Sequence, residues 1–324
     1  MTVFTRRAFA LGSGALLLPS QLHAQAGWPT SPVTVVVGYT PGGSTDIDAR
    51  ELAHIMSSKI GQQIVIDNKG GANGSIGLRA VASARPDGYT IFFGNETNVA
   101  INPYLQKGMI DTLTSLAPIC QVTIFQHVLV MSPKAPVNTP ADLVALARKE
   151  PGKLTFSSPG VGSSAHLAAA LFGEATGVRF THVPYKGTAP ALADVISGQI
   201  TMTFSTLPPA VSQIKGGNLK ALAVTGERRV AALPDIATLR EQGIEVVVVN
   251  WQGLFAPAKT PETVLDEIEK AAKQAMKDPK WPEALSRNGV ELAPDRTRAQ
   301  FARLVADEHA FWGKNLKALK IEVE

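Results

Sequence analysis

The chain has 324 residues and a mass of 34.3 kDa, a length that suits two domains, each able to bury its own core. Hydrophobic residues make up 45% and charged residues 18%, which excludes a disordered or fibrous protein. The single cysteine excludes a disulfide framework and any multi-cysteine metal site. The formal charge of +4 comes without a basic arm or stripe, so we expect no nucleic-acid partner.

The first 26 residues have the pattern of a secretory signal peptide that is removed from the mature protein. A basic Arg6–Arg7 pair precedes an apolar run from Ala8 to Leu18, and small residues place the cleavage site near Ala24 or Ala26. The paired arginines are typical of a twin-arginine export signal, and an ordinary Sec signal is the alternative. We therefore expect an exported protein.

The mature chain alternates short β-branched runs with helical patterns. The predicted strands are 33–38, 63–66, 90–93, 154–157, 181–184, 200–204 and 219–224, and a helical segment is expected after each of them except 90–93, which ends in the polar turn 94–97. The tail is predicted to be helical over 263–277 and 298–319. Strands that alternate with helices indicate βαβ units and mainly parallel sheets, so the fold class is α/β.

Two longer apolar segments, 119–131 and 245–255, interrupt this alternation. Each exceeds the length of an average strand and suits a segment that passes from one domain to another. The chain then leaves the first lobe once and returns once. We expect lobe 1 to contain residues 27–125 and 251–324, lobe 2 to contain residues 126–250, and the two crossover strands to form a hinge.

Glycine-rich and polar turns follow several predicted strands, where open α/β sheets bind their ligands. Helix N-termini at these turns present unpaired N–H groups and partial positive charge. The candidate ligand-binding residues are Tyr39, Gly42, Gly43, Ser44, Thr45, Asp46, Asn95, Thr97, Gly162, Ser163, Ser164, His166, Thr188 and Ser205. The alternative is that they only cap helices and pack turns. Asp46 is expected to bond first-turn N–H groups or hold a water, and His166 to be structural rather than catalytic.

The patterns of common enzymes are missing from the sequence. We find no Walker A motif, no G-x-G-x-x-G after the first strand, no G-x-S-x-G elbow and no H-E-x-x-H, and the six histidines are dispersed. We therefore predict no cofactor, no metal site and no catalytic residue. A serine hydrolase that uses Ser163 or Ser44 is the alternative from another class, although a Ser163–His166 pair has no obvious orienting acid.

Nine segments in register resemble the receptors of tripartite tricarboxylate transporters, also called Bug-type receptors. They are 38–46 (GYTPGGSTD), 67–72 (DNKGGA), 85–90 (RPDGYT), 151–154 (PGKL), 162–167 (GSSAHL), 182–187 (HVPYKG), 219–224 (LKALAV), 233–235 (LPD) and 253–257 (GLFAP). Each is modest alone, but together they span nearly the whole mature chain.

The resemblance implies a two-lobed, type II periplasmic binding protein fold that closes around a small carboxylate. In that family the turns matching Tyr39 to Asp46 and Gly160 to His166 hold the carboxylate, and the receptor delivers it to a membrane permease. A receptor that serves a sensor kinase instead is an alternative, and we expect a monomer.

Two departures from the family pattern bear on the ligand. Many relatives carry Asp-Asn where this chain has Ser205-Thr206, which favours a dicarboxylate or an aromatic acid over an amino acid. Relatives usually have Arg-Pro-Gly where this chain has Lys69-Gly70-Gly71, a turn that we expect to be structural.

Overall fold

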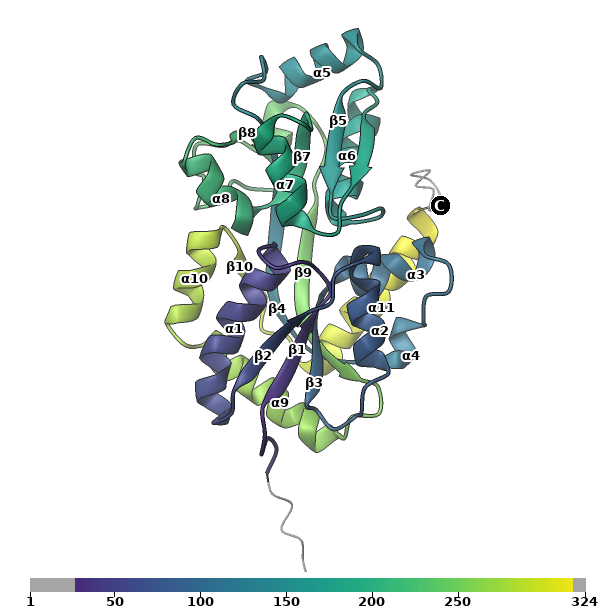
Figure 1. Cartoon of the computed structure of the whole chain (residues 1–324), viewed down its shortest axis with the longest axis vertical. Coiled ribbons are helices and arrows are strands. Elements are labelled where there is room, and N and C mark those ends of the chain that lie inside the picture. The colour runs from purple at the N-terminus through teal and green to yellow at the C-terminus, as the bar shows by residue number, and fades with distance from the viewer. Residues whose placement is uncertain (1–26, 317–324) are drawn as a thin grey trace, which may run out of the picture.

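The computed structural model describes residues 27–316 and arranges them as two α/β lobes joined by two long strands (Figure 1). The predicted signal peptide, its cleavage site and the end of the predicted helix at Leu319 lie outside the described residues. Within those residues, no helix combines the length and apolarity that crossing a membrane requires.

The first lobe is built around a sheet with the strand order β2-β1-β3-β9-β4-β10. Strands β1, β2 and β3 are parallel, and β9 runs antiparallel to both β3 and β4. The bounds of the strands are β1 Val33–Val37, β2 Ile64–Asn68, β3 Thr90–Asn95, β4 Leu116–Met131, β9 Val249–Pro257 and β10 Glu291–Leu292. The sheet is therefore mixed where the crossover strands join it.

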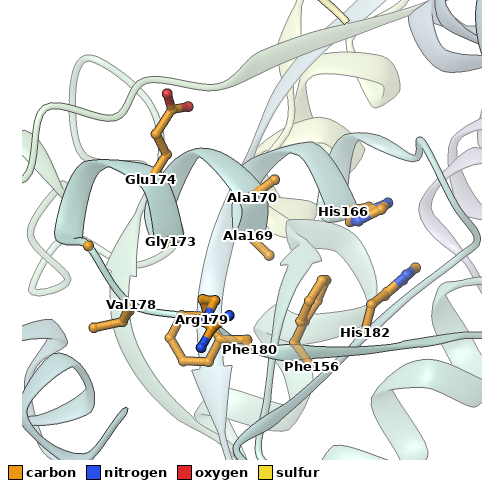
Figure 2. A pocket seen from close by; sticks show the side chains of 11 residues that line it. Phe156, His166, Ala169, Ala170, Gly173, Glu174, Val178, Arg179, Phe180 and His182 are labelled. Atoms are coloured by element: carbon orange, nitrogen blue, oxygen red, sulfur yellow. The ribbon is translucent and has the colours of Figure 1, made fainter. Parts of the chain in front are cut away.

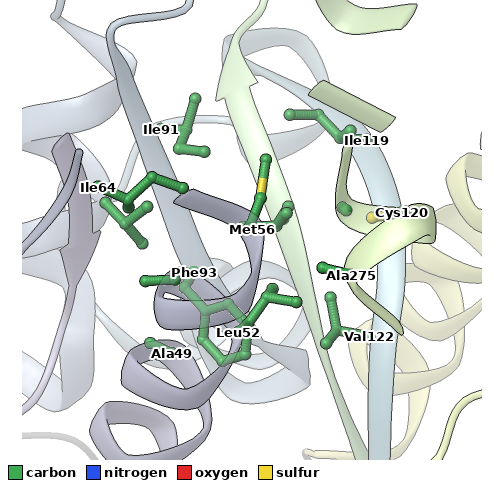
Figure 3. Packing of buried hydrophobic residues seen from close by; sticks show 14 of the residues in the cluster. Ala49, Leu52, Met56, Ile64, Ile91, Phe93, Ile119, Cys120, Val122 and Ala275 are labelled. Atoms are coloured by element: carbon green, nitrogen blue, oxygen red, sulfur yellow. The ribbon is translucent and has the colours of Figure 1, made fainter. Parts of the chain in front are cut away.

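Helices cover both faces of this sheet. They are α1 Ser44–Ile60, α2 Ser75–Ala82, α3 Asn102–Leu105, α4 Thr112–Ser115, α9 Glu262–Met276, α10 Lys280–Asn288 and α11 Arg298–Asn315, with short turns of helix at Ala72–Gly74 and Thr97–Ile101. On one face, Leu52 and Met56 of α1 pack with Phe93 and with Cys120 (Figure 3). Cys120 is buried, as predicted, and burial raises the pKa of its thiol to about 12. On the other face, Phe301 of α11 closes a second core.

The second lobe places β5 and β6 parallel to each other and β5 parallel to β7, while β7 and β8 flank the end of β4 in antiparallel pairs. Its strands are β5 Thr155–Ser158, β6 Thr181–Pro184, β7 Met202–Thr206 and β8 Lys220–Val224. Its helices are α5 Pro140–Lys149, α6 Ser164–Thr176, α7 Thr188–Ser197 and α8 Leu207–Lys215, with a short 3₁₀ turn at Arg240–Gln242. Two apolar clusters form its core.

One predicted helix is wrong. The segment after β8 forms turns and a short 3₁₀ helix rather than an α-helix. Residues 225–248 instead run back along the sheet, and Val224 forms an isolated parallel bridge with Thr238. Thr225 Oγ1 accepts from the His127 N–H of β4 and donates to the Val248 carbonyl. Gly226, Pro234 and Gly243 punctuate this segment and favour turns.

Strand β4 belongs to both sheets. Its residues Leu116 to Gln126 pair with β9, and its residues His127 to Met131 pair with β7 and β8. A single strand that changes partners midway carries the chain from one lobe to the other. The return runs through β9, which begins opposite Gln126 (Figure 1).

Candidate functional site

A small cavity lies where the turns of the two lobes meet. The first lobe contributes Tyr39, Gly43, Ser44, Thr45, Asn95 and Thr97; the crossover strand contributes Phe125; the second lobe contributes Pro159, Ser163, Ser164, Thr188 and Thr206. None of these lining residues carries a charged side chain. The polar groups of the cavity are hydroxyls, an amide and the backbone, and Tyr39 and Phe125 add aromatic surface.

Helix N-termini from both lobes converge on this cavity. Helix α1 begins at Ser44, α6 at Ser164 and α7 at Thr188, and all three residues line the cavity. The capping positions of α1 and α7 are Gly43 and Gly187, neither of which offers a side-chain cap. The first-turn N–H groups have no partner within their helices, and the helix dipoles add positive potential. The arrangement suits an anion without any lysine or arginine.

Helix α8 contributes differently. It follows Thr206, and prolines occupy its second and third positions, Pro208 and Pro209. Proline has no N–H to offer, so this helix end presents fewer backbone donors. The Thr206 Oγ1 is buried and has no hydrogen-bond partner among the described residues. At this corner the cavity offers a hydroxyl where the other helices offer backbone N–H groups.

A network of buried amides supports the first-lobe wall around Tyr39. The Tyr39 hydroxyl donates toward Asn73 and accepts from Asn98 Nδ2 at 2.8 Å and from Asn95 Nδ2 at 3.4 Å. Asn102 Nδ2 donates to the Asn73 carbonyl at 2.9 Å, as does Asn98 Nδ2. Burial raises the pKa of Tyr39 to about 12, so the ring stays neutral. These side chains satisfy one another and fix the shape of the wall.

The second-lobe wall contains a serine backed by a buried histidine. Ser164 Oγ lies 3.0 Å from His127 Nε2. His127 is completely buried, and burial lowers its pKa to about 3, so the ring is neutral. Its Nδ1 has no hydrogen-bond partner among the described residues. His127 lies on β4 directly opposite Thr206, at the point where the strand enters the second lobe.

The lobes touch around the cavity. Asn73 Nδ2 of the first lobe donates to the Val161 carbonyl of the second at 3.2 Å. A Cβ placed on Gly42 would lie 3.6 Å from the Ala189 Cβ, and one placed on Gly187 would lie only 2.3 Å from Thr40 Oγ1. The lobes are thus in a closed arrangement. Gly187 has no side chain, and the Thr40 side chain fills the space where its Cβ would lie.

Nine of the predicted site residues line the cavity: Tyr39, Gly43, Ser44, Thr45, Asn95, Thr97, Ser163, Ser164 and Thr188. That they contact a ligand remains a prediction. The other five do not line it. Gly42 donates its N–H to Asp46 at 2.9 Å, and Asp46 also accepts from Arg50 and Asn68, which lowers its pKa despite burial. Asp46 therefore stabilises the turn before α1 through the Gly42 N–H, which precedes the first-turn N–H groups that the sequence predicts it to bond.

In the second lobe, Gly162, His166 and Ser205 also lie outside the cavity wall. The Gly162 N–H donates to His166 Nδ1 at 3.0 Å, which directs the ring away from the cavity. Ser205 is buried and donates to the Thr206 carbonyl at 2.9 Å. Because strand residues alternate in direction, Thr206 rather than Ser205 faces the ligand cavity. Ser163 Oγ accepts the His166 backbone N–H, and His166 Nδ1 accepts from Gly162, so these bonds do not pair the Ser163 hydroxyl with the imidazole.

A larger groove lies within the second lobe, between α6 and the edge strand β6 (Figure 2). His166 stacks on His182 with ring centroids 4.0 Å apart, and Phe156 stacks on His182 in turn. Ser158 Oγ lies 2.6 Å from His182 Nε2. The groove belongs to one lobe only, so lobe closure does not enclose it. The cavity between the lobes is therefore the better candidate site.

Sequence reasoning missed Phe125, Pro159, Thr206 and His127. Phe125 and His127 lie on a long apolar run, where a site residue looks like any core residue. Thr206 belongs to the Ser205-Thr206 pair at which the sequence departs from the family pattern, and that departure could have identified it. Pro159 opens the same turn as Gly160 and Gly162, so its position in the chain could have identified it.

Comparisons with known proteins agree with the fold. The model of the family described as "Tripartite tricarboxylate transporter family receptor" matches residues 48–321. The chain is 32% identical to protein BugT of Bordetella pertussis over 291 residues, covering 88% of each chain. It resembles the structure of Rpa4515 of R. palustris with adipate, at 33% identity and a TM-score of 0.87, covering 91% of this chain and 99% of that one.

A second solved structure is similar over most of its length. MatC of Rhodopseudomonas palustris with bound malate is 28% identical, has a TM-score of 0.84, and is matched over 88% of this chain and 99% of that one. The matched shares of the chain show that these similarities extend through both lobes.

Proposed function

Because the chain belongs to the tripartite tricarboxylate transporter receptors, the Bug-type periplasmic solute-binding proteins, we propose that it binds a small organic carboxylate between its lobes and delivers it to a tripartite tricarboxylate-type membrane permease. The observation that carries this proposal is the convergence of three helix N-termini from two lobes on one uncharged cavity. A receptor that feeds a sensor kinase would use the same cavity.

The energetics suit binding by main-chain donors. A hydrogen bond to a charged group contributes ~1.5–3 kcal/mol, and a micromolar complex needs about 8 kcal/mol net. Four or five such contacts reach that range after the costs of association and ordering. Closure around the cavity excludes water and strengthens each contact.

We favour a dicarboxylate or an aromatic acid as the ligand class. Two related structures hold adipate and malate. Phe125 offers a flat apolar surface to the carbon skeleton, and the lining residues include no acid that would pair with an ammonium group. We further propose that residues near 125–126 and 250–251 form the hinge, where β4 changes partners, and that the mature receptor is a monomer.

The chemistry of the cavity argues against the hydrolase alternative. Ser44 faces Gln252 rather than a base. Ser164 does lie beside a histidine, but His127 Nδ1 has no carboxylate to orient it, and a pKa of about 3 makes the ring a poor base at neutral pH. We propose that the protein releases its ligand unchanged.

A thermal-shift screen tests this proposal. The mature protein is heated with succinate, malate, adipate, benzoate and citrate, and each mixture is checked for chemical change. We expect a large rise in Tm with one or a few of these acids and no turnover. Product formation that Ser164→Ala abolishes would support a hydrolase, and the absence of any shift across a broad acid library would contradict the receptor.

A further inference from the structure

We propose that His127 is a positioning residue that makes the Ser164 hydroxyl a hydrogen-bond donor to the bound acid. This inference rests on the proposed function and adds a role for a residue that lies outside the cavity wall. His127 Nε2 and Ser164 Oγ are 3.0 Å apart, and Ser164 is one of the residues that line the cavity.

The hydrogen-bond network assigns the tautomer of His127. A neutral imidazole carries one proton, on Nδ1 or on Nε2. His127 is fully buried, and its Nδ1 has no partner among the described residues. A proton on Nδ1 would leave a buried N–H donor unsatisfied, which is rarer in folded proteins than an unsatisfied acceptor. The proton therefore lies on Nε2, and His127 donates to Ser164 Oγ.

This assignment leaves the hydroxyl proton of Ser164 free. Because Ser164 Oγ accepts from His127, its own O–H points away from the ring and is available to the cavity. Ser164 is also the first residue of α6, so its hydroxyl lies beside the first-turn N–H groups of that helix. The Ser164 hydroxyl and the first-turn N–H groups of α6 then donate to the same oxygen of the ligand.

The imidazole cannot easily turn away from this role. The His127 backbone N–H donates to Thr225 Oγ1 at 2.9 Å, and the Thr225 N–H donates back to the His127 carbonyl at 2.9 Å. Phe125 packs against the ring with centroids 5.7 Å apart. The His127 imidazole is thus held on strand β4, which pairs with β9 on one side of this residue and with β7 from it onward.

A double-mutant cycle tests the coupling. The dissociation constant is measured by calorimetry for whichever acid of the panel above binds most tightly, using wild type, His127→Met, Ser164→Ala and the double variant. Loss of one hydrogen bond to a charged ligand weakens binding on the order of tenfold. We expect such a loss in each single variant and no further loss in the double variant, because His127 acts on the ligand only by positioning the Ser164 hydroxyl. Additive losses would overturn the inference.

A conservative variant separates positioning from packing. Glutamine places an amide donor near the position of the imidazole Nε2, so His127→Gln is expected to bind within about threefold of wild type. If His127→Gln binds as weakly as His127→Met while unfolding at the same urea concentration as wild type, His127 does not act through a donated proton.

Side-chain ¹⁵N NMR of the wild-type protein reads the tautomer directly. We expect the proton on Nε2 of His127, and a proton on Nδ1 would overturn the assignment. If wild type binds no acid of a broad library, the proposed function fails and the inference with it. Binding by wild type without coupling between the two positions would sink the inference alone.

Discussion

The two sides of the cavity differ in how their polar groups are held. Around Tyr39, in the first lobe, hydroxyl and amide groups bond to one another in a closed set that includes Asn73, Asn95 and Asn98. On the second-lobe side, Ser164 is backed by a single histidine and Thr206 Oγ1 has no partner among the residues described. The first-lobe network fixes the shape of the cavity wall, whereas the second-lobe hydroxyls are left available to bond a ligand. We therefore expect the first lobe to govern stability and the second to govern affinity.

The largest effect is expected from a clash between the lobes. Gly187→Ala keeps an extended backbone but places a Cβ 2.3 Å from Thr40 Oγ1 across the cavity rim. Overpacking of this kind costs about 2–3 kcal/mol, which would weaken ligand binding roughly 30- to 150-fold by opposing closure. Calorimetry with the ligand measures it. Adding Thr40→Ala should restore much of the affinity, and a G187A protein that binds normally would show that closure does not bring these turns together.

Tyr39→Phe breaks the network of the first lobe. It removes a hydroxyl that serves three buried asparagines and leaves their amide groups short of a partner. The free energy of unfolding should fall by about 1–3 kcal/mol. Urea denaturation without ligand checks this. An unchanged midpoint would mean that the asparagines satisfy one another without the tyrosine.

Asp48 lies behind the first-lobe wall and predicts a pH dependence. It is buried on α1, and burial raises the pKa of its carboxyl from near 3.8 to about 8, partly opposed by Gln252. The folded protein holds this proton more tightly than the unfolded chain, so the contribution to stability is full below about pH 4 and is lost as the pH rises through about 8. The slope is at most about 1.4 kcal/mol per pH unit.

Asp48→Asn removes this titration while keeping the side chain's size. The unfolding free energy of the variant, measured by urea denaturation from pH 4 to pH 8, should fall less steeply than that of wild type. Glu96 remains in both proteins and has a pKa that burial raises to about 8, so part of the slope persists. Parallel curves for the two proteins would mean that Asp48 does not titrate in this range.

The smallest effect is expected on the second-lobe side. Thr206→Val removes a buried hydroxyl that has no partner among the described residues, so stability without ligand should stay the same or rise slightly. Affinity should fall by about 1 kcal/mol, roughly fivefold, if the ligand accepts from this hydroxyl. Paired measurements of unfolding and binding check it. A loss of stability with unchanged affinity would reverse the proposed contrast between the lobes.

Much of the fold follows from local pattern. The strands β1 and β3 are short β-branched or apolar runs, and the turns after β1 and β5 carry the glycines and hydroxyls that open helices α1 and α6. These features depend on neighbours in sequence, so the sequence alone predicts them, together with nine residues of the cavity wall.

The remaining site residues depend on register and on long-range pairing. His127 is separated from Ser164 by 37 positions, and only the pairing of β4 with β7 and the packing of α6 bring them together. Thr206 rather than Ser205 lines the cavity because a one-residue change of register reverses the face of a strand. The direction of the His166 ring likewise depends on its stack with His182, which the sequence does not reveal.

Backbone amide NMR tests the central claim most directly. An acid that raises the Tm is titrated into ¹⁵N-labelled mature protein, and the N–H resonances of Ser44 and Thr45 in one lobe and of Ser164 and Thr188 in the other are followed. We predict that all four shift together with one dissociation constant, because the helix ends they open face one cavity. Shifts confined to one lobe, or gathered around His166 and His182, would contradict the account.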